Sequence, residues 1–320
     1  MESSVRRIPI LAPSAIHCRL LLAVTLTLLT TTLQAQSEVR VLDPPDVSPV
    51  DPIPDNTFVP LRGDLSAVGY LSGNLDRAHH FLRRLDLITA SFNKWADAAV
   101  PVVGYLVDRK TWDEMQLPGL YGIPVRTGPT AIVVPTSGDA ETVRMWRSIL
   151  GVDALPLNPG VPLHGTADEA ASLAIVDVLA QVEAARGFVT RSRLIGAEPW
   201  ISELIAHLAA RVLFAEYEPD KLGQIDWVYD QILEAYGGVG QDGQREFRAE
   251  LALGEIADIE RWLWYQGAFA RGARVAHGQR GAKSIKALLK ATRKSRSGLS
   301  EAVLRDTFPG IDAWLQTTFR

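Results

Sequence analysis

The chain has a single cysteine in 320 residues, Cys18. It lies in the amino-terminal segment, residues 1–35, which has the composition of a signal peptide. From residue 36 onward the sequence has no thiol, which excludes disulfides, a thiolate nucleophile and cysteine-ligated metals from that part. Cys18 also precedes the apolar run of the segment, whereas a lipoprotein carries its cysteine at the end of that run.

Other signatures are absent as well. There is no glycine-rich phosphate loop and no Gly-x-Ser-x-Gly motif, so the sequence gives no support for nucleotide binding or for a serine hydrolase. Basic residues are not in excess, since 33 Lys and Arg stand against 37 Asp and Glu, for a net charge of −4. This balance does not favour nucleic acid as a partner.

The only long apolar run is near the amino terminus. Arg6, Arg7 and Arg19 precede the run LLLAVTLTLLTTTLQA, and Leu33–Ala35 at its end is a plausible signal-peptidase site. The run is too short to cross a bilayer comfortably, because a spanning helix needs about 20 apolar residues. We therefore expect a cleaved signal peptide and an exported protein, periplasmic or extracellular. The alternative is an uncleaved anchor in the inner membrane.

Residues 36–60 follow as a proline-rich, acidic linker. Six prolines fall in this stretch with little periodicity, and proline fixes the backbone while removing a hydrogen-bond donor. Residues 61–166 are expected to form a subdomain with an amino-terminal helix over 65–99 and a small β-sheet. The runs PVVGYLVD and TAIVVPTS are its strand candidates, and residues 140–150 are an amphipathic helix.

Residues 167–320 are expected to be a helical subdomain. Its centre is a pair of helices within 168–217, joined by a loop over 187–198, and the first helix is apolar nearly all round. Further helices follow, with a possible break near Gly254 and Gly267. The predicted fold class is α+β, mostly α, with a small mixed sheet of three to five strands packed on the helix pair.

Polar residues at helical spacing mark this central pair. Asp177 and Gln181 are four residues apart in the first helix, and Glu203 and His207 are four apart in the second. Residues four apart share a helix face. The second helix opens with Pro199–Leu204, which is similar to the Pro-x-Trp-Leu-x-Glu-Gly motif that follows the zinc helix in gluzincin-type metallopeptidases.

On this motif and the order of elements, residues 100–320 resemble the peptidase MA-like gluzincins, zinc metallopeptidases with a small sheet. The tail, with Tyr265, Trp314 and Phe319, also looks like that family. The resemblance implies a helix bearing His-Glu-x-x-His and a glutamate ligand on the next helix. Two imidazoles on one face and that glutamate hold zinc, and the motif glutamate is the general base.

In this chain the family positions are not conserved chemically. They fall on Asp177 and Gln181 for the two histidines, Val178 for the base and Glu203 for the third ligand. A register one turn later places Gln181 and Ala185 at the ligand positions. Both registers lack imidazoles and a base, and glutamine is a poor zinc ligand. The resemblance therefore implies a degenerated zinc site, with no metal, no cofactor and no catalytic residue.

Simpler roles remain open for these side chains. Asp177 and Gln181 are also read as buried groups hydrogen-bonded to loop backbone. Glu203 near a helix amino terminus is favoured by the helix dipole, and it can pair locally with His207. A metal held by Asp177, Glu203 and His207 is a further alternative.

The other histidines give weaker signals. The adjacent His79 and His80 point about 100° apart on a helix, so they are not a ligand pair and are expected on a helix surface. His164, in a Pro/Gly-rich loop, is expected to be solvated.

One charged stretch stands out near the carboxyl end. Arg271–Arg296 contains nine Lys and Arg residues and no acidic one. The stretch is read either as the solvated face of helices or as a contact for an anionic partner, such as a membrane surface, a polyanion or an acidic protein face.

These readings predict an exported, catalytically inactive metallopeptidase-like protein that acts as a binding or scaffold module in the cell envelope. Its partner would be an unidentified protein or peptide. One alternative is an active hydrolase with non-standard ligands. Another is a helical envelope protein unrelated to peptidases.

Overall fold

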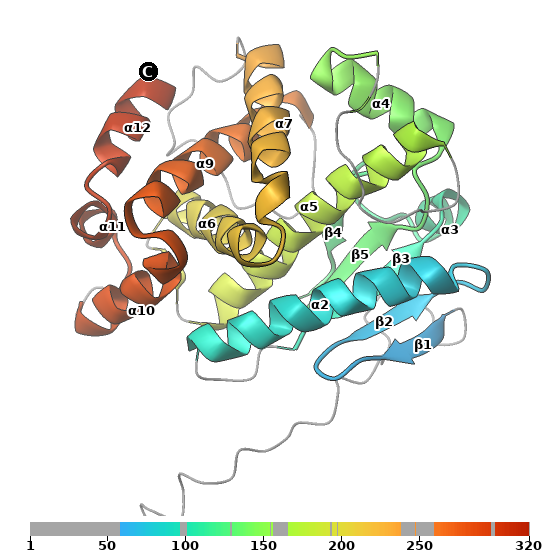
Figure 1. Ribbon diagram of the computed structural model, residues 1–320, viewed down its shortest axis with the longest axis horizontal. Coiled ribbons are helices and arrows are strands. Elements are labelled where there is room, and N and C mark those ends of the chain that lie inside the picture. The colour runs from blue at the N-terminus through green and yellow to red at the C-terminus, as the bar shows by residue number, and fades with distance from the viewer. Residues whose placement is uncertain are drawn as a thin grey trace, which may run out of the picture. The chain divides into compact units, whose positions relative to one another are not determined.

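The structure is a computed structural model, and it describes residues 58–96, 101–128, 130–153, 155, 166–192, 194–196, 198–237, 247, 259–295 and 298–319. All of these belong to one compact unit, Asp43–Arg320, so the predicted subdomains 61–166 and 167–320 share it. The signal-peptide segment, most of the linker and His164 lie outside the described residues. The predicted class, α+β and mostly α with a small mixed sheet, is confirmed (Figure 1).

The sheet has five described strands in the order β1-β2-β3-β5-β4. Their bounds are Val59–Arg62, Ala67–Tyr70, Val103–Val107, Val125–Arg126 and Ala131–Pro135 for β1 to β5. The central strands β2, β3 and β5 are parallel, and the edge strands β1 and β4 each pair antiparallel with their neighbour. The two strand candidates of the sequence are β3 and β5.

The predicted helix over 65–99 is wrong at its start. Residues 59–70 form the hairpin β1–β2, and the helix α2 runs only over Leu75–Ala96. Gly69 explains part of the difference, since a Cβ on it would lie 2.9 Å from the ring of Tyr105 on the neighbouring strand. Gly73 makes the turn into α2 with φ +94°. The first strand also begins inside the stretch read as a linker.

Two short helices follow the central strands. The helix α3, Arg109–Glu114, begins after Asp108, and α4, Ala140–Leu150, begins after Asp139. Each aspartate accepts a hydrogen bond from a first-turn backbone N–H, which stabilises a helix start. Gly151, with φ +62°, ends α4 in the left-handed conformation. The predicted helix over 140–150 is confirmed.

The central helix pair consists of α5, Ala167–Arg191, and α6, Pro199–Tyr217. Thr166 and Glu169 form a reciprocal capping box at the start of α5. The predicted loop over 187–198 is too long, because α5 continues through Gly187 to Arg191. Every residue from Val178 to Val189 is buried, so tertiary packing holds the last turns helical despite the glycine.

The carboxyl-terminal part is helical. A 3-10 helix, Pro219–Lys221, leads into α7, Leu222–Ala235. The helices α9 to α12 span Ile259–Arg280, Ser284–Lys294, Glu301–Thr307 and Ile311–Thr318. A second 3-10 helix, Gly281–Lys283, joins α9 to α10. The predicted break near Gly267 is wrong. Gly267 lies inside α9, where a Cβ would meet the Tyr229 carbonyl oxygen of α7 at 2.9 Å. Glycine here permits close helix packing; Gly254 lies outside the described residues.

Alternate residues along the strands face two cores. Leu106, Ile132 and Val134 point into the main core, which α2 and α5 cover on one face of the sheet. Tyr105 and Val133 face a smaller cluster with Trp112 of α3 on the other face. The helix α5 thus touches β4, β5, α2, α4 and α6, and Figure 1 shows it passing between the sheet and the carboxyl-terminal helices. None of the helices in the described ranges has both the length and the apolarity to traverse a lipid bilayer.

Candidate functional site

The Asp177 side chain lies between α5 and α2, where it is 3% exposed. Arg77 of α2 donates two hydrogen bonds to it, from Nη1 to Oδ2 at 2.9 Å and from Nη2 to Oδ1 at 2.5 Å. His80 Nε2 is 3.6 Å from Oδ2. Burial acts to raise the pKa of Asp177, but the Arg77 guanidinium and His80 outweigh it and hold that pKa well below its usual range. The partner of Asp177 is therefore a helix side chain, which corrects the expectation of loop backbone.

Gln181 points to the neighbouring helix instead. Its Nε2 donates to the carbonyl oxygen of Ala210 on α6 at 3.2 Å, so its partner is helix backbone rather than loop backbone. Val178, at the position of the family's general base, is buried among apolar side chains.

Glu203 is held by an arginine. Arg186 of α5 donates from Nε to Glu203 Oε1 at 3.0 Å and to Oε2 at 2.8 Å, and its Nη2 also contacts Oε1. The same guanidinium donates to Glu183 and, at 2.7 Å, to Gln266 Oε1 of α9. All four side chains are at most 5% exposed. We refer to Glu183, Arg186, Glu203, His207 and Gln266 as the Arg186 cluster.

The electrostatics of the cluster follow from burial around one cation. Burial acts to raise the pKa of Glu203, but Arg186 outweighs it and holds that pKa well below its usual range. For Glu183, burial prevails over the attraction of Arg186, and together with the Glu203 carboxylate it raises the pKa to about 7. The pKa of Arg186 is raised, because the two carboxylates outweigh its burial. One lasting ion pair, Arg186–Glu203, therefore forms the centre of the cluster.

His207 completes the cluster through an amide. Its Nε2 lies 3.0 Å from Gln266 Oε1 and 3.5 Å from Glu203 Oε1. The local approach of His207 to Glu203 that the sequence suggested is present. Tyr229 and Phe269 pack edge-on and tilted against the imidazole.

The structure does not bring the family positions into one site. On α6, Glu203 contacts Arg186, while Ala210, seven residues further on, contacts Gln181. At 1.5 Å per residue the two contacts are about 10 Å apart along the helix. Asp177 shares a face of α5 with Gln181, but its partner is Arg77 of α2 rather than a group on α6. Within the described ranges, no three His, Cys, Asp or Glu side chains are arranged to hold a metal ion, so the alternative site of Asp177, Glu203 and His207 is not formed.

The comparisons with known proteins give no relative. No protein-family model, no curated protein and no solved structure matches this chain.

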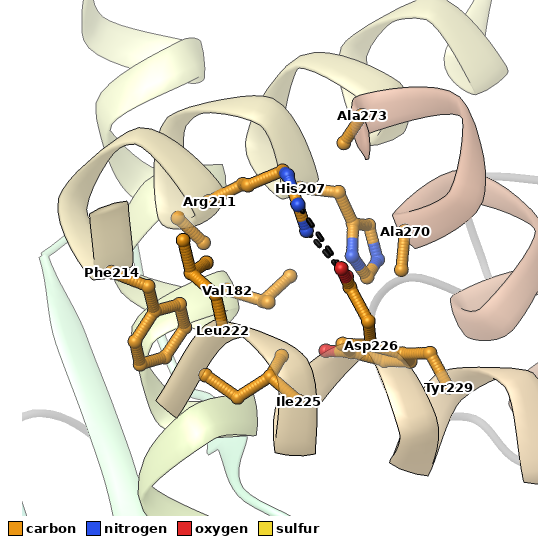
Figure 2. A pocket seen from close by; sticks show the side chains of 11 residues that line it. Val182, His207, Arg211, Phe214, Leu222, Ile225, Asp226, Tyr229, Ala270 and Ala273 are labelled. Atoms are coloured by element: carbon orange, nitrogen blue, oxygen red, sulfur yellow. Dashed lines mark hydrogen bonds and ion pairs between the residues drawn. The ribbon is translucent and has the colours of Figure 1, made fainter. Parts of the chain in front are cut away.

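A small cavity adjoins His207. Figure 2 shows it lined by side chains of α5, α6, α7 and α9, with Arg211 and Asp226 joined by hydrogen bonds of 2.5 Å and 3.1 Å along one side. Its volume is about 20 Å³, enough for a single water molecule. The Tyr229 hydroxyl has no hydrogen-bond partner among the described residues, so a water here would satisfy it. The space excludes any organic substrate.

A larger groove lies between α2 and α6, with Gln181 of α5 in its lining. We call it the α2–α6 groove; it has a volume of about 280 Å³ and is lined by α2, α5, α6 and Glu218. Leu87 and Tyr217 on its walls are 46% and 39% exposed. The Tyr217 hydroxyl is fixed by Ser91 Oγ at 2.8 Å. Arg83 is exposed and has no ion-pair partner within the described residues.

A cleft of about 610 Å³ lies at the carboxyl ends of the parallel strands, a common place for ligands in such sheets. Two of the carboxylates that line it, Asp139 and Glu169, already serve the fold. Asp139 accepts from Arg109 at 2.7 Å and caps α4, and Glu169 accepts from the Thr166 backbone N–H at 2.6 Å. Arg77, on its wall, is engaged by Asp177. Arg77, Asp139 and Glu169 are therefore held by partners within the fold and do not point to a ligand in this cleft.

Sequence reasoning missed the side chains that bind Asp177, Glu203 and His207. Arg77, Arg186 and the amide of Gln266 were not among the candidates. Arg186 left a signal, because an arginine in the otherwise apolar run 184–189 of a buried helix requires a buried acceptor. Arg77 and Gln266 left none, since they lie 100 and 59 residues from the groups they contact, Asp177 and His207.

Proposed function

We propose that this protein is an exported, non-catalytic module of the cell envelope, with a metallopeptidase-like arrangement of sheet and helices, that binds a protein or peptide partner through the α2–α6 groove. The main support for a non-catalytic role is the contact between Arg186 and Glu203. Among the four positions of the family's metal site, only Glu203 has the residue that the family uses, and both of its oxygens accept hydrogen bonds from the guanidinium. A metal ion could bind this carboxylate only by displacing a buried guanidinium that already neutralises its charge.

The sheet edge supports the metallopeptidase-like arrangement over an unrelated helical protein. The short edge strand β4 lies beside α5 and pairs on its other side with β5. A strand edge along the central helix is what the resemblance requires. Its Arg126 is buried enough to lower its pKa, although Glu183 attracts it. The positive charge of Arg126 and Arg186 in this region further disfavours a bound cation.

The groove suits an extended segment with an apolar side chain. Leu87 and Tyr217 expose apolar area in the lining of the groove, and exposed apolar groups beside a hollow are typical of binding surfaces. Arg83 is available to an acidic group of the same segment, while Arg84 is occupied by Glu218. The partner chemistry is thus an apolar anchor flanked by a carboxylate.

Metal content and peptide cleavage test the non-catalytic part. We expect protein purified without chelator to hold no stoichiometric zinc or manganese and to leave casein and a peptide library intact. We also expect EDTA to leave its unfolding midpoint unchanged. Stoichiometric zinc with cleavage that EDTA abolishes would establish the alternative, a hydrolase with non-standard ligands.

Site-specific cross-linking tests the groove. A photoreactive amino acid at Leu87 should capture a discrete partner in cells, and Arg83→Glu should reduce the yield severalfold. Leu120, which is equally exposed at 46% but lies between α3 and β4, is the matched control and should capture none. Equal capture at both positions would show that the groove has no binding role.

A further inference from the structure

Seven of the nine cations in the basic stretch Arg271–Arg296 form two groups in the structure; of the other two, Arg280 donates to the Thr307 carbonyl oxygen and Arg296 lies outside the described residues. On α9, Arg271 and Arg274 pair with Asp230 of α7, at 3.2 Å and 3.0 Å. The pKa of Arg274 is raised, first because of its hydrogen bond to Asp230. These cations hold two helices together, so this half of the stretch is structural.

The second half is different. Lys283, Lys286, Lys290, Arg293 and Lys294 are all exposed, and none of them has an ion-pair partner within the described ranges. They lie on α10 and the turn before it, at spacings of three and four residues, which place them on one side of the helix. We refer to these five residues as the α10 basic face. It extends about 16 Å at 1.5 Å per residue.

The opposite side of α10 is anchored in the core. Ile285 and Leu288 are fully buried and Leu289 is 7% exposed, so the helix cannot turn its apolar side outward without unfolding the packing against α6 and α9. The exposed side of α10 carries no aromatic and no large apolar residue. Whatever this face binds, it binds by charge.

We propose that the α10 basic face docks the protein on an anionic phospholipid bilayer. A planar array of negative headgroups matches a row of cations that lies on one side of a helix, and each such cation adds to binding independently of shape. A protein partner fits less well, because stable protein interfaces need an apolar centre. Single-stranded nucleic acid fits less well, because no aromatic side chain interleaves the cations for base stacking.

This docking surface is separate from the α2–α6 groove. It also differs from insertion, because no apolar side chain of α10 is free to enter the bilayer. Binding should therefore fall steeply with salt, as expected for exposed charges separated by about a Debye length or more. Since Lys286 and Lys290 do not line the groove, we expect their substitution to leave cross-linking at Leu87 unchanged. The experiments on the two surfaces can therefore fail independently of each other.

Vesicle sedimentation tests the proposal with the full chain. The probes are phosphatidylcholine vesicles with and without phosphatidylglycerol, so that any contribution of the apolar amino-terminal segment is common to both. We expect tighter binding to the anionic vesicles, and we expect Lys286→Gln/Lys290→Gln to weaken this difference about 25-fold, or about fivefold for each cation. High salt should abolish the difference in the wild type.

The matched control removes the same charge elsewhere. Lys110 of α3 and Arg144 of α4 are exposed, and Figure 1 places both helices at the opposite side of the fold from α10. Lys110→Gln/Arg144→Gln should retain anionic binding within about twofold. Equal loss in the control, or equal binding of wild type to both vesicles, would overturn the proposal. So would binding of a labelled oligonucleotide that only the α10 variant loses, without any preference for anionic vesicles.

Discussion

The charges of α5 and those of α10 serve opposite purposes. Along α5, Asp177 and Arg186 are almost fully buried, and each is matched by an opposite charge from the core. Along α10, the lysines are exposed and no described carboxylate meets them. Buried charges are tolerated only with hydrogen-bonded partners, and their loss is costly. Exposed charges cost little and remain available to other molecules. The comparison thus separates charged residues that stabilise the fold from charged residues that are available to bind other molecules.

Arg186→Met tests the buried side of the comparison most strongly. The substitution keeps an unbranched side chain but leaves Glu203 buried without its cation, so we expect the free energy of unfolding to fall by about 3–5 kcal/mol. Urea unfolding followed by circular dichroism measures the change. Adding Glu203→Leu should recover much of the loss, because an apolar pair can replace a buried ion pair. A loss in the single variant below about 1 kcal/mol would mean that the pair is not formed.

Asp177→Asn is expected to have the next largest effect. Asparagine keeps one acceptor for Arg77 but removes the charge, and hydrogen bonds to charged groups are worth about 1.5–3 kcal/mol each. We expect a loss of about 2–3 kcal/mol in the same measurement. The control is Glu114→Gln, which breaks the exposed i, i+4 pair with Lys110 and should cost about 0.5 kcal/mol or less. Similar values for both would erase the distinction between buried and exposed pairs.

Glu183 gives the comparison a pH dependence. Its pKa rises from an ordinary value of 4.5 to about 7 on folding, so between these values the folded protein binds more protons than the unfolded chain. Its contribution to the unfolding free energy is therefore fully present below pH 4.5 and is lost as the pH rises through 7. The difference in unfolding free energy between wild type and Glu183→Gln should follow this slope. A difference that does not vary with pH in this window would contradict the raised pKa.

The exposed side should show the smallest effect on stability. Lys286→Gln/Lys290→Gln removes two side chains that support no described contact and keeps good helix formers. We expect the free energy of unfolding to change by at most about 0.5 kcal/mol. A larger loss would mean that these lysines stabilise the fold, and the weaker vesicle binding would then have to be measured again at a temperature where both proteins are folded.

Local sequence signals predicted several elements correctly. The helix over 140–150 has an aspartate at its start, an amphipathic pattern and a glycine at its end, and all three act within a few residues. The hairpin β1–β2 was missed because its strands have four residues each, too few for a period of two to stand out. Gly69 reads as a helix weakener, whereas its reason is the ring of Tyr105 across the sheet.

The site was predictable only in part. Asp177, Gln181, Glu203 and His207 were recognised as polar residues on buried helices, and they are buried. Their partners were not recognised, because the contacts of Arg77 and Gln266 depend on how distant helices meet. The packing of α5 against α2 and of α6 against α9 is set by the whole core rather than by any local pattern.

The contact between Arg77 and Asp177 joins residues 100 positions apart, and further along the same two helices Phe92 of α2 stacks on Phe188 of α5 with ring centroids 4.5 Å apart. When only the first 166 residues have been synthesised, the sheet and α2 are present, but Asp177, the counter-ion of Arg77, and the covering helix α5 are still missing. The apolar face that α5 covers therefore stays exposed during synthesis until α5 is made. A chain truncated at this point would expose that face and aggregate instead of folding as a small protein.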